Sequence, residues 1–141
     1  MIGADTGLRV RQPEAAGLIP AIQVRHEPEY VLVTLAGEID FAAVAALRQR
    51  LFALAGTGHP IVADLDGVSF IDAAGLGVLA GAARRAAIHG AALHVVCARR
   101  QTRRLVRLTR LDRVVVLSGS LDEALRLLPA DQGVPVAAAA V

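Results

Sequence analysis

The sequence has few aromatic residues and little sulfur. Aromatic side chains make up 3% of the 141 residues and Trp is absent, so the hydrophobic core must be built from Leu, Val, Ile and Ala. The lone Cys97 excludes an internal disulfide bond, leaves no zinc site of ordinary cysteine spacing, and is typical of a reducing compartment. Lys is also absent, and all 15 basic residues are Arg, a usage that we interpret as coding bias.

Long uncharged apolar runs are missing as well. The longest candidate spans residues 73–83 and is bounded by Asp72 and Arg84, whereas a membrane-spanning helix needs about 18–20 apolar residues. The amino terminus lacks the basic start and apolar block of a secretory signal. We therefore expect a cytoplasmic protein without a membrane span.

The residues that are present indicate a single folded domain. Hydrophobic residues make up 55% and charged residues 20%, which is typical of a globular chain rather than a disordered one. A chain of this length is one domain with one core. The formal net charge of +2 is too small to indicate a nucleic-acid partner by itself.

Hydrophobic periodicity predicts an alternating order of strands and helices. The expected elements are strands at 22–26 and 30–36, a helix at 41–55, a strand from 61 to 71 with a polar break, a helix at 73–89, a strand at 93–97, a helix at 99–109, a strand at 114–117 and a helix at 121–128. The first two strands read as a hairpin, and the later alternation favours parallel strands. We predict an α/β domain at 21–128, with flexible ends at 1–20 and 129–141.

Several polar residues stand where helices should begin or end. Asp40 and Asp72 precede helical stretches and can cap them, and Ser120 with Glu123 forms a capping box. Gly56 and Gly58 fit a left-handed helix end. In the strand before Asp72, we expect three residues to return the chain to the core: Val68, Phe70 and Ile71.

No set of residues indicates catalysis or metal binding. A catalytic serine needs a base within reach, and the four His residues are far apart in sequence, with His94 expected to face solvent from its strand. The carboxylates are interpreted as helix caps and solvated loop groups. We expect no enzyme activity, no catalytic residue, no metal and no cofactor.

The helix from residue 73 is built almost wholly of small and aliphatic residues. Three glycines, each a cost of roughly 1 kcal/mol relative to Ala, suggest close approach of another surface, either the protein's own sheet or a partner. We expect an inward face of Leu76, Leu79, Ala83 and Ala87. The outward face would then be Ala74, Val78, Gly81, Ala82 and Arg85, an apolar surface typical of a partner-binding site.

Arginines are concentrated in one later segment. Residues 99–113 carry seven Arg and one Asp, a net charge of +6, which leaves −4 for the rest of the chain. Such a stripe can meet phosphates of nucleic acid or anionic lipid, but no aromatic residue accompanies it. We interpret it as a solvated helix face with Leu105 and Leu108 turned inward, and we expect no nucleic-acid partner.

Four segments in order resemble the STAS domain family of anti-sigma factor antagonists. Residues 64–79, DLDGVSFIDAAGLGVL, resemble the family signature, and Gly37-Glu-Ile-Asp40 is similar to its Gly-Glu-Leu-Asp element; residues 103–112 and 120–125 sit where the family has similar segments. The resemblance implies a small mixed, mostly parallel sheet with about four helices. Family members under kinase control carry Asp-Ser-Ser-Gly, whereas this chain has Ala73 and Ala74, so the phosphate-accepting hydroxyl is absent.

The resemblance implies a partner and a surface. The partner would be an anti-sigma factor of the ATP-binding kinase type, whose capture frees a sigma factor, and this chain would be a monomer or weak dimer. The expected partner-binding residues are Glu38, Asp40, Asp72, Ala73, Ala74, Gly75, Gly77, Val78, Gly81 and Arg85. The alternatives are a STAS subunit of a lipid-transport or stress-signalling complex, or a small-ligand sensor. The absence of the acceptor serine favours these alternatives.

Overall fold

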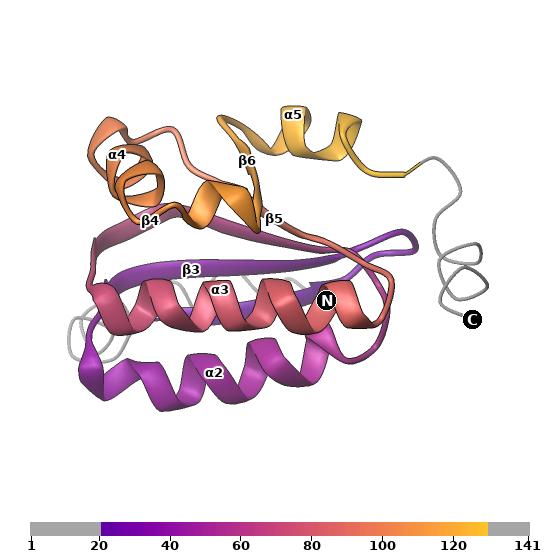
Figure 1. Cartoon of the computed structure of the whole chain (residues 1–141), viewed down its shortest axis with the longest axis horizontal. Helices are drawn as coiled ribbons and strands as arrows, with labels where there is room; N and C mark the ends of the chain where they lie inside the picture. The colour runs from indigo at the N-terminus through magenta and orange to yellow at the C-terminus, as the bar shows by residue number, and fades with distance from the viewer. Residues whose placement is uncertain (1–20, 130–141) are drawn as a thin grey trace.

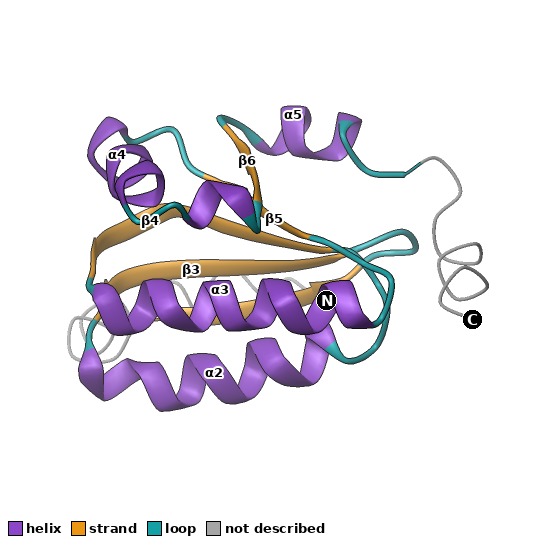
Figure 2. Ribbon diagram, viewed as in Figure 1, coloured by secondary structure: helices purple, strands orange, loops and turns teal. Residues whose placement is uncertain are grey.

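A five-stranded sheet forms the centre of the computed structural model, which describes residues 21–129 (Figures 1 and 2). In spatial order its strands are β2 (Ala21–His26), β3 (Val31–Ile39), β4 (Ile61–Ile71), β5 (Leu93–Val96) and β6 (Val116–Ser118). The helical elements are α2 (Phe41–Ala55), α3 (Ala73–Ile88), α4 (Arg100–Leu108), the 3-10 turn η2 (Leu111–Arg113) and α5 (Leu121–Arg126). The extensions predicted at 1–20 and 130–141 lie outside the described residues.

The strand directions confirm the predicted fold class. β2 and β3 form an antiparallel hairpin, and β3, β4, β5 and β6 are parallel neighbours. A four-residue loop joins the hairpin strands, as expected. The sheet is therefore mixed and mostly parallel, and in the described part of the chain four α-helices accompany it.

The two faces of the sheet are covered differently. α2 and α3 lie side by side and bury the larger core, in which Leu35, Leu47, Leu65 and Leu79 are fully buried (Figure 1). α5 covers the opposite face with a smaller apolar cluster of Leu32, Val62, Val96 and Ala124. Because successive side chains of a strand point to opposite faces, each central strand contributes to both clusters.

The predicted helix caps are confirmed. Asp40 Oδ1 accepts hydrogen bonds from the amides of Ala42 and Ala43 at 3.1 and 3.3 Å, and Asp72 Oδ1 accepts from Gly75 N at 3.1 Å. Ser120 Oγ accepts from Glu123 N at 3.1 Å, whereas Glu123 Oε1 accepts from Gly119 N at 2.7 Å rather than from Ser120 N, so one half of the predicted capping box forms. At the end of α2, however, Gly58 is left-handed with φ +85°, whereas Gly56 has φ −79° and keeps a right-handed conformation.

Two strands differ in extent from the prediction because of tertiary contacts. β4 is one strand through its polar residues, because it pairs with β3 along its length, with irregular register between Asp64 and Gly67 and between Val68 and Phe70. Two contacts from the segment after β5 add to this pairing: Asp66 Oδ1 accepts from Ala98 N at 2.7 Å, and Arg99 Nη1 donates to the Val68 carbonyl at 2.9 Å. The last strand is shorter than predicted, since η2 and a turn occupy residues 111–115.

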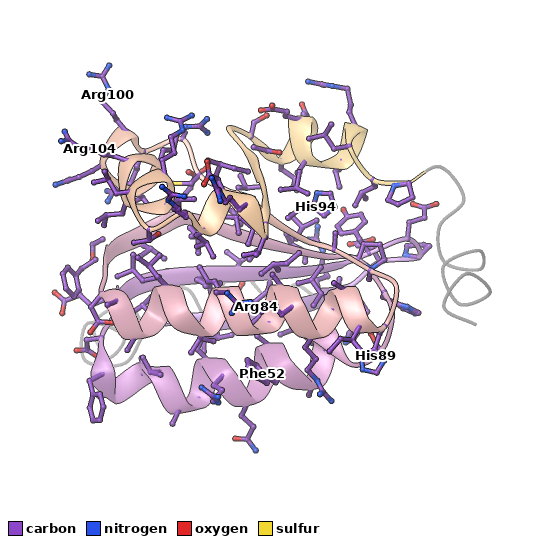
Figure 3. All side chains as sticks on the ribbon, in the orientation of Figure 1. Phe52, Arg84, His89, His94, Arg100 and Arg104 are labelled. Carbon is purple, nitrogen blue, oxygen red and sulfur yellow. The ribbon has the colours of Figure 1, made fainter. Side chains whose placement is uncertain are left out.

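Two predicted side-chain orientations are wrong. In α4 the buried residues are Thr102 and Val106, whereas Leu105 and Leu108 are 37% and 67% exposed rather than turned inward. His94 does not face solvent and is buried, because α5 covers its face of the sheet (Figure 3). The helix that covers His94 lies far downstream in the sequence.

Candidate functional site

Three helices begin at one edge of the sheet. α2 follows β3, α3 follows β4 and α4 follows β5, and because these strands are parallel their carboxyl ends meet at the same edge, on the left in Figure 1. The edge brings together Glu38, which is exposed, with Asp40 and Asp72, which are half-buried. The topology thus brings to one edge three carboxylates that are predicted as partner-binding residues.

The first turn of α3 presents small side chains to solvent. Ala73, Ala74 and Gly77 are exposed, and a Cβ atom built at Gly77 would meet no atom within 4 Å. Gly75 is different: its position is buried, and a Cβ there would lie 2.8 Å from Ile71 Cγ1 and 3.0 Å from Ile39 Cγ2. Gly75 therefore allows the helix start to approach the sheet, while its neighbours form a smooth outer surface.

Two exposed phenylalanines flank this turn, and the sequence interpretation missed both. Phe41, the first residue of α2, is 82% exposed, and Phe70, near the end of β4, is 50% exposed. Phe70 pairs in register with Glu38 of β3, so it does not return to the core as predicted. Exposed aromatic side chains in a chain so poor in them are the signal that could have identified an interaction surface.

The remainder of the predicted outward face of α3 is covered. Val78 is 2% exposed and Ala82 is fully buried, because this side of α3 packs on α2. Gly81 lies under Phe52 of α2: a Cβ at Gly81 would be 2.8 Å from Phe52 Cζ (Figure 3). The prediction that Val78, Gly81 and Ala82 form an exposed docking face is wrong, and the close approach that the glycines indicated is made by the protein itself.

Two further residues of α3 complete this correction. The side chain of Arg85 is exposed, but its Nε donates a hydrogen bond to the Phe52 carbonyl at 2.9 Å, which ties it to α2. Ala87, predicted to face inward, is exposed. The inward prediction is confirmed for Leu76, Leu79 and Ala83, which are all buried. Of the predicted surface, the accessible part is therefore the start of α3 with its acidic neighbours, together with the side chain of Arg85 that is tied to α2.

Three polar side chains are buried in the described part of the chain, those of His94, Thr102 and Ser118. His94 Nδ1 and Ser118 Oγ have no hydrogen-bond partner in the structure, and desolvation lowers the pKa of His94. Burial raises the pKa of the Cys97 thiol, which favours its unreactive protonated form. Among residues 21–129, no group of three or more His, Cys, Asp or Glu side chains is arranged to hold a metal ion.

The chain is similar to known proteins in both sequence and structure. A sequence model of the STAS domain family matches residues 21–124. An anti-sigma-B factor antagonist from Bacillus subtilis is 30% identical over 97 residues, which cover 69% of this chain and 89% of that protein. The crystal structure of an anti-sigma factor antagonist from Mycobacterium paratuberculosis has a TM-score of 0.68 and 29% identity, covering 77% of this chain and 93% of the other.

A more distant structure shows the same fold. The Bacillus cell fate determinant SpoIIAA in its phosphorylated form has a TM-score of 0.58 and 24% identity, covering 75% of this chain and 97% of that protein. Within the described residues, no helix has the length and hydropathy required to cross a membrane.

Proposed function

This chain belongs to the STAS domain family, and we propose that it is an anti-sigma factor antagonist that acts by binding an anti-sigma factor in the cytoplasm and so frees a sigma factor. The observation that carries the proposal is the exposed first turn of α3, free of hydroxyl groups and flanked by two exposed phenylalanines. We call this surface the docking edge and define it as Glu38, Asp40, Phe41, Phe70, Asp72, Ala73, Ala74 and Gly77.

The docking edge has the composition of a protein interface. Phe41 and Phe70 offer apolar area of the kind that dominates interface energetics, while Ala73, Ala74 and Gly77 let a partner approach the helix backbone closely. The surrounding carboxylates favour a partner with a basic rim, which would speed association. Binding of this kind requires no catalytic group in this chain, so we propose a non-enzymatic role.

The residue at position 74 determines how binding is controlled. A phosphoserine there would place about −1.5 to −2 charges on the first turn of α3, where the charge would have to be desolvated against the apolar part of the partner's surface. Ala74 has no hydroxyl to accept phosphate. We propose that the docking edge stays in its binding-competent form, even when the partner is an ATP-binding kinase.

The test uses titration calorimetry to measure the affinity of this chain for a purified anti-sigma factor of the kinase type from the same organism. The Phe41→Ala/Phe70→Ala double variant should bind about tenfold or more weakly, since each buried interface aromatic contributes on the order of 1 kcal/mol or more. Ala87→Ser, an exposed change near the far end of α3, is the matched control. Equal affinity of the double variant and the control would show that the docking edge is the wrong surface.

A second experiment tests the regulatory part of the proposal. Incubation with the same kinase and ATP should leave the wild-type protein without phosphate, whereas Ala74→Ser restores an acceptor hydroxyl at an exposed helix start and should be modified. Phosphate found on the wild-type protein at any residue near the start of α3 would contradict a permanently competent docking edge.

A second candidate function follows from the same missing hydroxyl. A STAS subunit of a larger assembly, such as a lipid-transport or stress-signalling complex, or a small-ligand sensor, has no need of a phosphate acceptor at position 74. Co-purification from native extract separates the candidates, because an anti-sigma kinase supports the first, and a transporter ATPase or large scaffold supports the second.

A further inference from the structure

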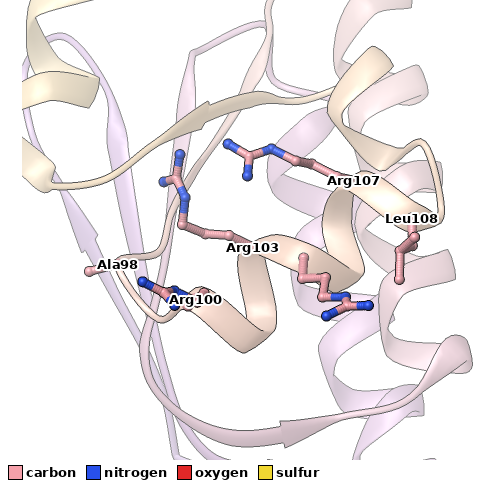
Figure 4. Close-up of a pocket in the computed structure, with 6 residues that line it drawn as sticks. Ala98, Arg100, Arg103, Arg107 and Leu108 are labelled. Atoms are coloured by element: carbon pink, nitrogen blue, oxygen red, sulfur yellow. The ribbon is translucent and has the colours of Figure 1, made fainter.

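Four arginines of α4 line a single open concavity. Its volume is about 530 Å³, within the range of small-molecule sites (Figure 4). The lining residues are Ala98, Arg100, Arg103, Arg104, Arg107 and Leu108. The arginines recur three and four positions apart, so they share one side of the helix, and Figure 3 shows Arg100 and Arg104 extending outward from it.

An acid lies near Arg103: a Cβ built at Gly119 would be 3.5 Å from Glu123 Oε1 and 3.6 Å from Arg103 Nη1. Within residues 21–129 none of the four lining arginines is ion-paired to a carboxylate; the ion pair found in this part of the chain joins Arg25 to Glu27. Arg103 is held by its Nη1, which donates to the Cys97 carbonyl at 3.0 Å, and it is half-buried. The guanidinium groups therefore keep most of their donors available for an anion.

The arrangement is unfavourable for the helix itself. Arginines three and four residues apart repel, each such pair destabilising a helix by about 0.2–0.5 kcal/mol. α4 has nine residues, buries Thr102 and Val106 alone, and its N-cap residue Arg99 makes no side-chain capping bond. On most solvated helices, acidic residues stand among the basic ones and offset their repulsion. α4 has no acidic residue to offset the repulsion between its arginines, and such a concentration of positive charge is expected where a helix binds an anion.

The lining chemistry defines the class of ligand. Guanidinium groups bind phosphate oxygens in a bidentate manner, and several on one face can grip successive phosphates. No aromatic residue lines the concavity, so a nucleobase or single-stranded nucleic acid would find nothing to stack on. The concavity is open to solvent, so a small ligand held there would be contacted by the arginines from one side.

We propose that the α4 concavity binds a soluble oligophosphate, a small molecule with two or more adjacent phosphate groups, read through its phosphate chain alone. Arg100, Arg104 and Arg107 grip the phosphates, and Arg103 fixes the floor through its bond to Cys97. This site is separate from the docking edge and does not depend on an anti-sigma factor being the partner.

The test is calorimetric titration of the full chain with inorganic tripolyphosphate at about 150 mM salt, where weak surface attraction is screened. We expect saturable binding that the Arg100→Gln/Arg104→Gln double variant weakens at least tenfold. Arg84→Gln, which removes one exposed arginine from α3, is the control and should bind as the wild type does. The double variant should also melt at or above the wild-type temperature without ligand, because it loses like-charge repulsion.

Five results would overturn the proposal. The first four are no saturable binding of tripolyphosphate, the same loss of affinity in Arg84→Gln as in the double variant, tighter binding to phosphatidylglycerol vesicles than to tripolyphosphate, and tighter binding to duplex DNA. The last two of these would assign the arginines to a membrane surface or to nucleic acid instead. The fifth is a double variant that melts well below the wild type, which would show that the arginines serve the fold.

Discussion

The first turn of α3 and the turns that follow it use the same small residues for opposite purposes. At Gly81 the missing side chain lets Phe52 of α2 lie against the helix, so smallness serves packing inside the molecule. At Gly77 no atom lies within reach of a Cβ, so smallness leaves an open surface. A stripe of small residues therefore does not identify a docking face until the position of the neighbouring helix is known.

An exposed residue and a buried residue are adjacent in α3 where the two regions meet. Gly77 is exposed and Val78 is buried, although they are adjacent in a helix that is apolar on nearly all sides. Substitutions on the two sides of this boundary should therefore separate loss of folding from loss of binding.

The largest effect should come from Val78→Asp. A carboxylate placed in the contact between α3 and α2 would be buried without a partner, and we expect a loss of about 3–5 kcal/mol of unfolding free energy. Urea denaturation followed by circular dichroism measures it. Gly77 lies one residue away and is exposed, so the free energy of unfolding of Gly77→Asp should lie within about 0.5 kcal/mol of the wild-type value. A stable, folded Val78→Asp protein would mean that α2 does not cover this side of α3.

Much of the fold could be predicted because its signals are local. Asp40, Asp72 and Ser120 cap the helices that follow them, and a cap depends on amides two or three residues away. The alternation of strands and helices likewise gave the parallel sheet without knowledge of distant contacts.

The errors arose where a distant element decides. α3 has so little polarity difference around its axis that periodicity could not tell which side would meet α2, and Val78 was therefore placed outside. The sequence predicts that His94 faces solvent, because the helix that covers its face of the sheet, α5, lies far downstream. Phe70 was assigned to the core on hydrophobicity alone, although its position on β4 leaves it half exposed.

The next largest effect should be on affinity alone. Ala74→Glu adds a negative charge to the exposed first turn of α3, as a phosphate would, without touching the α2 contact. We expect affinity for the anti-sigma factor to fall about 10- to 100-fold, which is about 1.4–2.7 kcal/mol, because the carboxylate would have to be desolvated against the apolar part of the interface. Unfolding free energy should hold or rise slightly, because a carboxylate favours a helix start.

The control for this charge is its position on the helix. Ala87→Glu carries the same group on an exposed position near the end of α3 and should bind the partner as the wild type does. Titration calorimetry of the two variants side by side measures the contrast. Equal affinities would show that the first turn of α3 is not where the partner binds.

A smaller effect separates two glycines within the first turn. Gly75→Ala should destabilise the protein by about 1 kcal/mol net, since crowding of Ile71 and Ile39 outweighs the gain in helix propensity. Gly77→Ala should stabilise it by roughly 0.5–1 kcal/mol, because its Cβ meets nothing. Thermal unfolding of both variants measures the signs, and two stabilised variants would contradict the close contact at Gly75.

The smallest effect concerns pH and the face of the sheet under α5. Burial lowers the pKa of His94 below the value of 6.5 that it has in the unfolded chain. Between those two values the unfolded chain binds a proton that the native protein does not, so stability is full above about pH 6.5 and falls as the pH drops toward the folded value. The slope from this one group is at most about 1.4 kcal/mol per pH unit.

His94→Leu removes the titrating group and should flatten this slope between about pH 7.5 and 5.5, measured by urea unfolding at several pH values. The same substitution should leave affinity at the docking edge unchanged, because His94 lies between the sheet and α5 while the docking edge lies at the start of α3. A variant as acid-sensitive as the wild type would mean that protonation of His94 is not what weakens the fold. A variant that loses partner binding would show that docking reads the far face of the sheet as well as the helix start.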